Sequence, residues 1–116
     1  MATEGKLVLL PFPFDDFRTA KVRPALCLTE PIGAYRHVIV AFISSRLPDA
    51  FLASDLLITR SHPEFASTGL KLDSVLKLHR LLTVPESLFQ RELGTLPSIL
   101  RSSVSDKLRT LFQLHL

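Results

Sequence analysis

The sequence predicts a mainly β fold, a small and strongly bent barrel or half-barrel of short strands followed by one C-terminal helix. Short runs of Val, Ile, Leu and Phe, which favour strands, recur through most of the 116 residues. Eight prolines punctuate the chain between and beside these runs. From Pro97 onward the apolar residues recur at helical spacing instead. One apolar stripe on one helix suits packing against a sheet.

Each apolar run predicts one strand. Leu7–Leu10 is wholly apolar and is followed by the sequence Pro-Phe-Pro-Phe. Pro24 is expected at the first residue of the second strand, where no ladder hydrogen bond is lost. Beyond a bend, Leu81–Val84 is expected to continue the pairing of the fifth strand. The predicted strands are Leu7–Leu10, Pro24–Leu28, His37–Ile43, Asp55–Thr59, Ser74–Leu78 and a short last strand at Phe89–Leu93.

Two short turns and one longer helix complete the expected elements. Pro63–Thr68 predicts a loop or a single helical turn closed by Gly69, and Pro85–Leu88 predicts a short helical turn. The C-terminal helix starts at Pro97 and runs nearly to the end of the chain. Its apolar stripe consists of Leu100, Val104, Leu108, Leu111 and Phe112.

Composition predicts one intracellular domain, residues 1–116, in the cytoplasm. Hydrophobic residues make up 47% of the chain, and no run has the length of a membrane span or the form of a signal peptide. The single cysteine, Cys27, lies in an apolar run, where a buried and unreactive thiol is expected. The net charge of +3 permits a polyanionic partner without requiring one.

The sequence carries no pattern typical of a metal or nucleotide cofactor. The four histidines stand apart, without a second ligand at the usual spacing. The four glycines are isolated, so no Gly-rich phosphate loop is present, and no serine lies in a Gly-x-Ser-x-Gly turn. We therefore expect neither a metal nor a cofactor.

The strongest candidate for chemistry is Arg23, a charged residue directly before Pro24 and an apolar strand. Ser44 and Ser45 follow another apolar strand, and two such strand ends can meet at one rim of a small barrel. A guanidinium beside a hydroxyl can bind phosphate, because it offers charged bidentate donors and the hydroxyl adds another. On residue types alone, the alternative remains that Arg23 is an ordinary exposed residue and the serines belong to a loop.

At these residues the sequence resembles the MazF/PemK-like toxins of type II toxin–antitoxin systems. The order and spacing of the motifs are more specific than any one motif, and the resemblance extends over nearly the whole chain. It is carried by GKLVLLPFPF at Gly5–Phe14, KVRPAL at Lys21–Leu26, AFISS at Ala41–Ser45, and the later segments Ser74–Leu78, Leu82–Val84 and Leu93–Leu96.

The resemblance implies an SH3-like barrel of the CcdB/PemK type, with five to seven short strands, that forms a homodimer. It implies a metal-independent endoribonuclease that cleaves single-stranded RNA, including mRNA, at short motifs after attack by the neighbouring 2′-hydroxyl. Arg23 and Ser44 would be the catalytic residues, stabilising the negative charge of the transition state. A cognate antitoxin, whose disordered segment wraps the toxin, would neutralise it.

Eight further residues are expected to contact RNA. The first loop of the family lines the RNA groove, and an aromatic ring there can stack on bases, although core packing suits Phe14 at least equally well. His79 and Arg80 lie where the family often carries an acidic residue followed by Gln. The expected contacts are Phe14, Asp16, Arg18, Lys21, Ser45, Arg46, His79 and Arg80.

Three residues depart from the family pattern. Lys6 replaces the usual Asp, Ser44 stands where Thr is common, and Leu82 stands where Arg is frequent. These departures keep open a second interpretation, an RNA- or antitoxin-binding module without catalysis. A third interpretation is a gyrase-targeting toxin of the CcdB type, which has the same kind of barrel.

Overall fold

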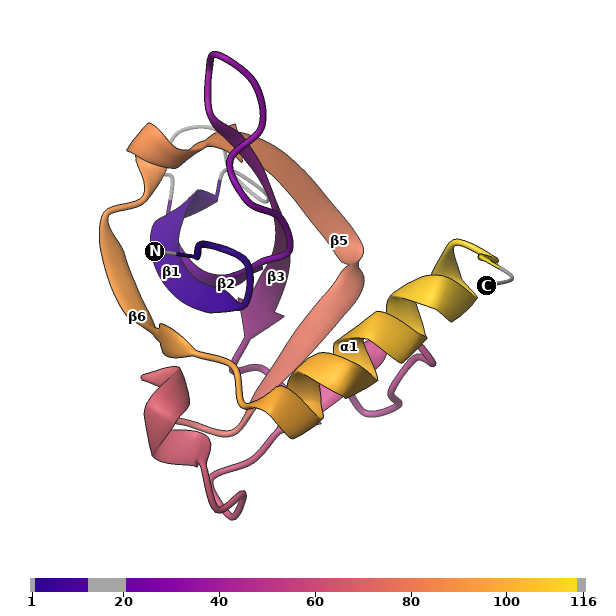
Figure 1. The fold of residues 1–116 in the computed structure, drawn as a ribbon. Coiled ribbons are helices and arrows are strands. Elements are labelled where there is room, and N and C mark those ends of the chain that lie inside the picture. The colour runs from indigo at the N-terminus through magenta and orange to yellow at the C-terminus, as the bar shows by residue number, and fades with distance from the viewer. Residues whose placement is uncertain (1, 13–20, 115–116) are drawn as a thin grey trace.

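The computed structural model describes residues 2–12 and 21–114, which form a curled antiparallel sheet and a C-terminal helix (Figure 1). The strands are β1 (Lys6–Phe12), β2 (Lys21–Cys27), β3 (His37–Ser44), β4 (Asp55–Ile58), β5 (Ser74–Pro85) and β6 (Arg91–Thr95). Two 3-10 turns, η1 (Phe65–Thr68) and η2 (Glu86–Leu88), and the helix α1 (Ser98–Leu111) complete the elements. The strand order is β4-β5-β3-β2-β1-β6, and the sheet curls into a half-barrel, as predicted.

Two apolar cores lie on opposite faces of the curled sheet. The inner core includes Val8, Leu10, Ala25, Val38 and Phe42. The outer core lies between the sheet and α1 and includes Leu7, Leu26, Ile43, Leu76 and Val104. Because successive residues of a strand point to opposite faces, a strand buried on both faces is apolar throughout. This explains the uninterrupted apolar run in β1.

The helix α1 covers the outer core with part of the predicted stripe, whereas Phe112 lies just after the helix and is 55% exposed. Val104 is buried, and Leu100 and Leu108 pack against the same core. Pro97 precedes the first helical residue, as expected for a residue with a helix-compatible φ and no N–H. Within residues 2–12 and 21–114, no helix combines the length and apolar character needed to cross a membrane.

β5 bends in its middle, where its pairing with β3 shifts register. Lys77 lies opposite Phe42, whereas Leu81 lies opposite Ala41, so residues 78–80 are additional on β5. Extra residues in one strand bend it and increase its local twist. The structure therefore confirms the bend that the sequence predicts in this strand, and Figure 1 shows β5 turning there beside α1.

Pro24 lies in the middle of β2 rather than at its first residue, so the predicted start of this strand is wrong. The pairing of β2 with β3 begins only at Ala25, whereas the pairing with β1 already includes Lys21. A residue without an N–H is tolerated where one edge of a strand is unpaired. Pro11 occupies an equivalent place, because β1 extends to Phe12 while β6 pairs only with Lys6–Leu9.

The last strand is displaced from the predicted Phe89–Leu93 to Arg91–Thr95. Phe89 N–H donates to the Glu86 carbonyl at 3.0 Å and closes η2, and the Phe89 ring packs against the inner core. The apolar residue that suggested a strand therefore closes a turn and covers the barrel. The other predicted elements are confirmed, with small differences at their ends.

Two glycines allow η1 to pack directly against β6. Gly69 closes η1 with a φ of +74°, in the left-handed region that favours glycine. A Cβ atom at Gly69 would lie 2.1 Å from the Leu93 carbonyl oxygen, and one at Gly94 would lie 2.2 Å from the Ser67 carbonyl oxygen. Larger residues at either position would push the turn away from the strand.

Candidate active site

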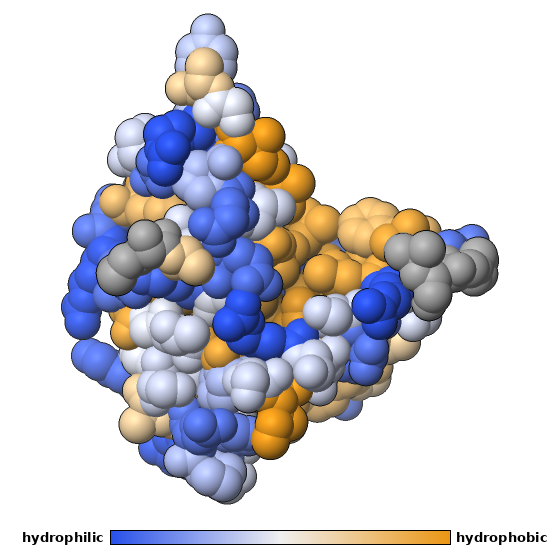
Figure 2. All heavy atoms as spheres, viewed as in Figure 1, coloured by the Kyte–Doolittle hydropathy of each residue, from blue (hydrophilic) through white to orange (hydrophobic). Residues whose placement is uncertain are grey.

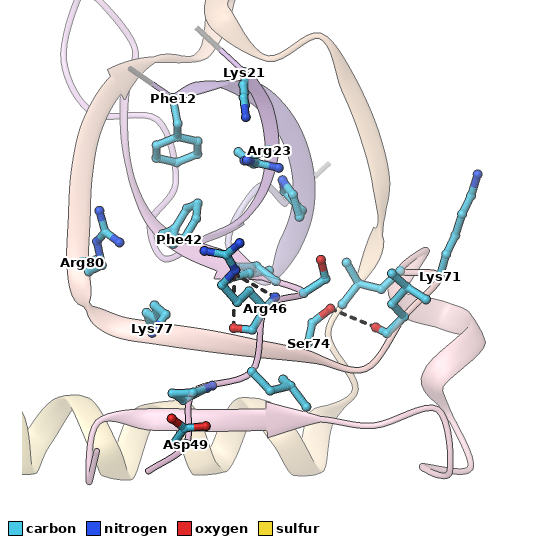
Figure 3. A pocket seen from close by; sticks show the side chains of 18 residues that line it. Phe12, Lys21, Arg23, Phe42, Arg46, Asp49, Lys71, Ser74, Lys77 and Arg80 are labelled. Atoms are coloured by element: carbon cyan, nitrogen blue, oxygen red, sulfur yellow. Dashed lines mark hydrogen bonds between the residues drawn. The ribbon is translucent and has the colours of Figure 1, made fainter. Parts of the chain in front are cut away.

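A groove of about 1150 Å³ opens where the pairing of β2 with β3 stops (Figure 3). Phe12, Pro24, Phe42 and Ile43 contribute apolar side chains to its lining. The rest of the lining comes from β2, the end of β3, two loops at residues 45–49 and 70–72, and β5. The groove therefore brings together segments that are far apart in the sequence.

Arg23 and Ser44 line this groove from neighbouring strands. Ala25 lies opposite Phe42 in the last pair of the β2–β3 ladder, and Arg23 and Ser44 each lie two residues beyond that pair, where the pairing has ended. Alternate residues share a face, so both side chains lie on the face of the sheet that Ala25 and Phe42 occupy. Arg23 is exposed and Ser44 is half-buried, so a ligand in the groove can reach both.

Ser44 also shapes the turn that follows β3. Its Oγ accepts a hydrogen bond from Arg46 N–H at 3.1 Å and donates to the Arg46 carbonyl at 3.5 Å. Side chain-to-backbone bonds of this kind stabilise tight turns. The 3.5 Å contact is long for a hydroxyl donor. A phosphate oxygen can therefore replace the Arg46 carbonyl as acceptor of the hydroxyl's hydrogen bond, while the shorter bond from Arg46 N–H holds the turn.

An aromatic pair supports Arg80 at the groove. The rings of Phe12 and Phe42 meet edge to face with their centroids 5.5 Å apart. The guanidinium carbon of Arg80 lies 5.0 Å from the centroid of the Phe42 ring, within the range of a cation–π interaction. Because Phe42 is only 9% exposed, its ring positions Arg80 rather than offering a free face to a ligand.

The groove has a strongly positive lining. Six of the 14 basic residues of the chain line it, namely Lys21, Arg23, Arg46, Lys71, Lys77 and Arg80. Asp49 is the only acidic residue among the described lining residues. In the described part of the chain no carboxylate pairs with the first five of these cations, whereas five basic residues elsewhere each have an ion-pair partner. Concentrated charge of one sign attracts a ligand of the opposite sign.

The groove brings together six of the residues that the sequence singles out, which are Lys21, Arg23, Ser44, Ser45, Arg46 and Arg80. His79 is exposed on β5 and is not among the residues that line the groove. Phe14, Asp16 and Arg18 lie outside the described residues. The catalytic and RNA-binding roles of all these residues stay predictions.

The sequence alone does not single out Lys71 and Lys77, which also line the groove. Lys77 interrupts the apolar run of β5, between the buried Leu76 and Leu78. A charge at such an alternate position indicates a strand face that meets water or a ligand. The sequence pattern cannot distinguish water from a ligand, because the environment of this face depends on how β5 pairs with β3. Lys71 lies in a loop before β5 and has no comparable signal.

The described residues lack an activated thiol and a cluster of metal ligands. Cys27 is fully buried in the inner core, which confirms that prediction, and burial raises the pKa of its thiol to about 12. A thiol with so high a pKa is neutral and a poor nucleophile at neutral pH. No group of three or more His, Cys, Asp or Glu among these residues could hold a metal ion.

The fold is similar to those of solved toxin structures. The Mycobacterium tuberculosis toxin MazF-mt6 superposes with a TM-score of 0.71 at 22% identity, over 96% of this chain and 99% of that chain. MazF from Deinococcus radiodurans gives a TM-score of 0.67 at 20% identity, over 96% of each chain. An endoribonuclease in complex with its cognate antitoxin, from a Mycobacterial species, gives a TM-score of 0.70 at 12% identity, over 100% and 99%. These similarities confirm the predicted fold class.

Sequence comparison places the chain in a family. No curated protein matches it. A family model described as PemK-like, MazF-like toxin of type II toxin–antitoxin system matches residues 3–112, which include all six strands and α1. The match also includes every residue described as lining the groove. The chain therefore belongs to the PemK-like, MazF-like toxins of type II toxin–antitoxin systems.

Proposed function

We propose that this toxin is an endoribonuclease that cleaves single-stranded RNA, including mRNA, at short motifs. Proteins of its family are generally endoribonucleases. The observation that carries the proposal is the groove that Arg23 and Ser44 both line, with six basic residues in its lining. Such a lining suits the phosphodiester backbone of a nucleic acid, because charged donors bind its oxygens and replace its counterions.

In this mechanism the RNA supplies its own nucleophile. The 2′-oxygen next to the scissile phosphate gives up its proton and bonds to phosphorus, while the bond from phosphorus to the 5′-oxygen breaks. The 5′-oxygen gains a proton, so the products are a 2′,3′-cyclic phosphate and a 5′-hydroxyl. The reaction requires no metal, because the substrate provides the nucleophile and the basic residues offset the charge. DNA lacks the 2′-hydroxyl and is not cut.

Arg23 and Ser44 act on the charge that builds up on the phosphoryl oxygens. The guanidinium of Arg23 donates two hydrogen bonds in a fixed geometry, and Ser44 Oγ donates a third. Donors aimed at charge that develops in the transition state lower the barrier more than they strengthen substrate binding. In this mechanism Arg23 acts as an electrostatic catalyst that binds the phosphoryl oxygens.

The first test is cleavage of an end-labelled single-stranded RNA in buffer containing EDTA. The wild-type protein is expected to cut, and Arg23→Ala to lose about 10²–10³-fold in rate, the usual effect of removing one such donor. Arg91→Ala is a matched control, because Arg91 is exposed on β6 and outside the groove. Cleavage that requires added Mg²⁺ would contradict the mechanism.

The second test replaces the single attacking 2′-hydroxyl at the cut site by hydrogen. Cleavage at that position is expected to disappear while cuts at other sites persist, and continued cleavage there would exclude the 2′-attack.

Expression in cells separates the competing classes of function. Loss of mRNA supports the nuclease, gyrase-dependent DNA breaks would indicate a gyrase poison, and normal growth would indicate a module without catalysis.

We further propose that the toxin works in the cytoplasm as a homodimer and is neutralised by a cognate antitoxin. Apolar surface gathers in the hollow between the barrel and α1 (Figure 2), and α1 exposes 69% of Ile99. Contiguous apolar surface on a small protein marks a site for a partner. Sedimentation equilibrium is expected to give twice the mass of the chain, and a monomer at every concentration would overturn the dimer.

A further inference from the structure

Lys77 faces the groove although its neighbours in β5 are core residues. Leu76 and Leu78 are fully buried in the outer core, so the residue between them points to the opposite face of the strand. That face carries Phe42, which lies directly opposite Lys77 in the β3–β5 ladder. Lys77 is half-buried and lines the groove, and Figure 3 shows it beside Phe42 and Arg80.

A carboxylate stands next to Lys77 in the sheet, yet the two do not pair. Asp55 lies opposite Lys77 in the β4–β5 ladder. Its Oδ2 instead accepts a hydrogen bond from Leu52 N–H at 2.9 Å, and no described carboxylate lies within 4.0 Å of the Lys77 ammonium. Asp55 thus serves the loop before β4, and the charge of Lys77 is left to the groove.

Two cations therefore flank the same aromatic ring. Lys77 is the cross-strand neighbour of Phe42, and the Arg80 guanidinium lies 5.0 Å from the centroid of that ring. The Lys77 ammonium, which no described carboxylate approaches within 4.0 Å, attracts an anion to this end of the groove. Since Phe42 is 9% exposed, the place suits a phosphate held by cations and not a base stacked on the ring.

Arg23 and Lys77 approach the groove from different strands. Arg23 belongs to β2 and Lys77 to β5, with β3 between them in the sheet. Neighbouring strands are about 4.8 Å apart, so the two residues are separated by about 10 Å across the sheet. A nucleic-acid strand lying across the three strands can contact both residues through different phosphates.

We propose that Lys77, with Arg80, forms a second subsite for a backbone phosphate, so that a single strand crosses the groove from β2 to β5. The inference rests on the proposed function only in that the groove binds single-stranded nucleic acid. Lys77 is a positioning residue, since it holds a phosphate other than the one that is cut. Its charge should therefore contribute to binding in proportion to the counterions it displaces.

The experiment measures binding of a fluorescent single-stranded RNA octanucleotide that carries 2′-O-methyl groups throughout and cannot be cleaved. The association constant is determined by anisotropy over a series of salt concentrations, for wild type, Lys77→Met, Lys77→Arg and the control Lys6→Met. Lys6 pairs with Glu92 at 2.8 Å and is not among the residues lining this groove. Lys77→Met is expected to reduce the slope of log K against log salt by about 0.7, the value for one phosphate on a single strand.

Two control variants show whether the change in slope comes from the charge at Lys77. Lys77→Arg keeps the charge and should keep the wild-type slope, and Lys6→Met should do so as well. A Lys77→Met slope equal to that of wild type would overturn the subsite, as would a wild-type protein that does not bind the octanucleotide. A lower slope in a protein that cuts no RNA would support the subsite and refute the nuclease. A wild-type protein that cleaves RNA, together with a Lys77→Met slope equal to that of wild type, would support the nuclease and refute the subsite.

Discussion

At the scale of single residues, Ser44 holds a turn with its hydroxyl group, and the proposed mechanism gives the same hydroxyl a second task. Its Oγ holds the turn to Arg46 and lies at the groove, so the hydroxyl is the part of the side chain that matters. Ser44→Thr keeps the hydroxyl and adds a methyl that restricts its rotamers, and we expect it to retain cleavage. Ser44→Ala removes the donor and should lower the cleavage rate about 10²–10³-fold.

Initial rates on a single-stranded RNA measure this difference. Ser102→Ala, on the exposed face of α1, controls for the loss of a hydroxyl elsewhere. A Ser44→Ala protein that cleaves at the wild-type rate would remove Ser44 from the mechanism and leave it a structural role in the turn.

At the scale of elements, the contact between η1 and β6 depends on Gly94. The added Cβ of Gly94→Ala would meet the Ser67 carbonyl oxygen at 2.2 Å, and backbone atoms cannot move away as a flexible side chain can. Overpacking of this kind costs about 1–3 kcal/mol, so we expect the melting temperature to fall by several degrees. Calorimetry checks this, with Gly33→Ala as the comparison, because no atom lies within 4 Å of a Cβ at Gly33. Gly33→Ala would be strained only by its φ of +71°, and an equal fall in both variants would contradict the steric argument.

The carboxylate of Glu30 helps to hold the N-terminal segment before β1. Glu30 accepts hydrogen bonds from Glu4 N–H at 2.7 Å and from Thr3 N–H at 2.9 Å. These bonds favour the charged form and lower the pKa of Glu30. The stabilisation is complete above the pKa of the unfolded chain, about 4.3, and is lost as the pH falls through the lower pKa of the folded state.

Glu30→Gln is therefore expected to lower the melting temperature at neutral pH and to have a smaller effect in acid. Melting curves from neutral to acidic pH measure this, with Glu64→Gln as the control, because no described residue bonds to the exposed carboxylate of Glu64. A Glu30→Gln effect that does not change with pH would mean that the charge of the carboxylate has no part in holding the segment.

At the scale of the whole molecule, Cys27 reports on the opening of the barrel. Its thiol is fully buried in the inner core, and burial raises its pKa to about 12. An alkylating reagent should therefore label it only when the barrel opens, at a rate that follows the unfolding equilibrium. Mass spectrometry of the labelled protein over a denaturant series tests this, and rapid labelling of the native protein would contradict the tight inner core.

Local sequence patterns predict most of this molecule's elements, because short apolar runs and helical spacing are local properties. Pro24 and Phe89 mislead for a common reason. Pro24 is tolerated inside β2 because β3 does not pair with that part of the strand. The N–H of Phe89 closes a turn instead of joining a strand. The local sequence shows neither of these contacts. Arg23 and Ser44 stand out by residue type and family resemblance, but the groove that both line depends on where the pairing of β2 with β3 ends. Whether the side chain of Lys77 faces the groove depends on the register of three strands, so the sequence alone cannot predict its place in the site.

The register shift in β5 has a consequence for how this protein can change over evolutionary time. In a strand with one fixed register, residues three apart such as Lys77 and Arg80 would point to opposite faces. The additional residues between the two ladders let both line the groove. The same irregularity separates the part of β5 that closes the barrel from the part beside the groove. Substitutions that alter the lining of the groove can therefore accumulate in one part while selection preserves the folding of the other.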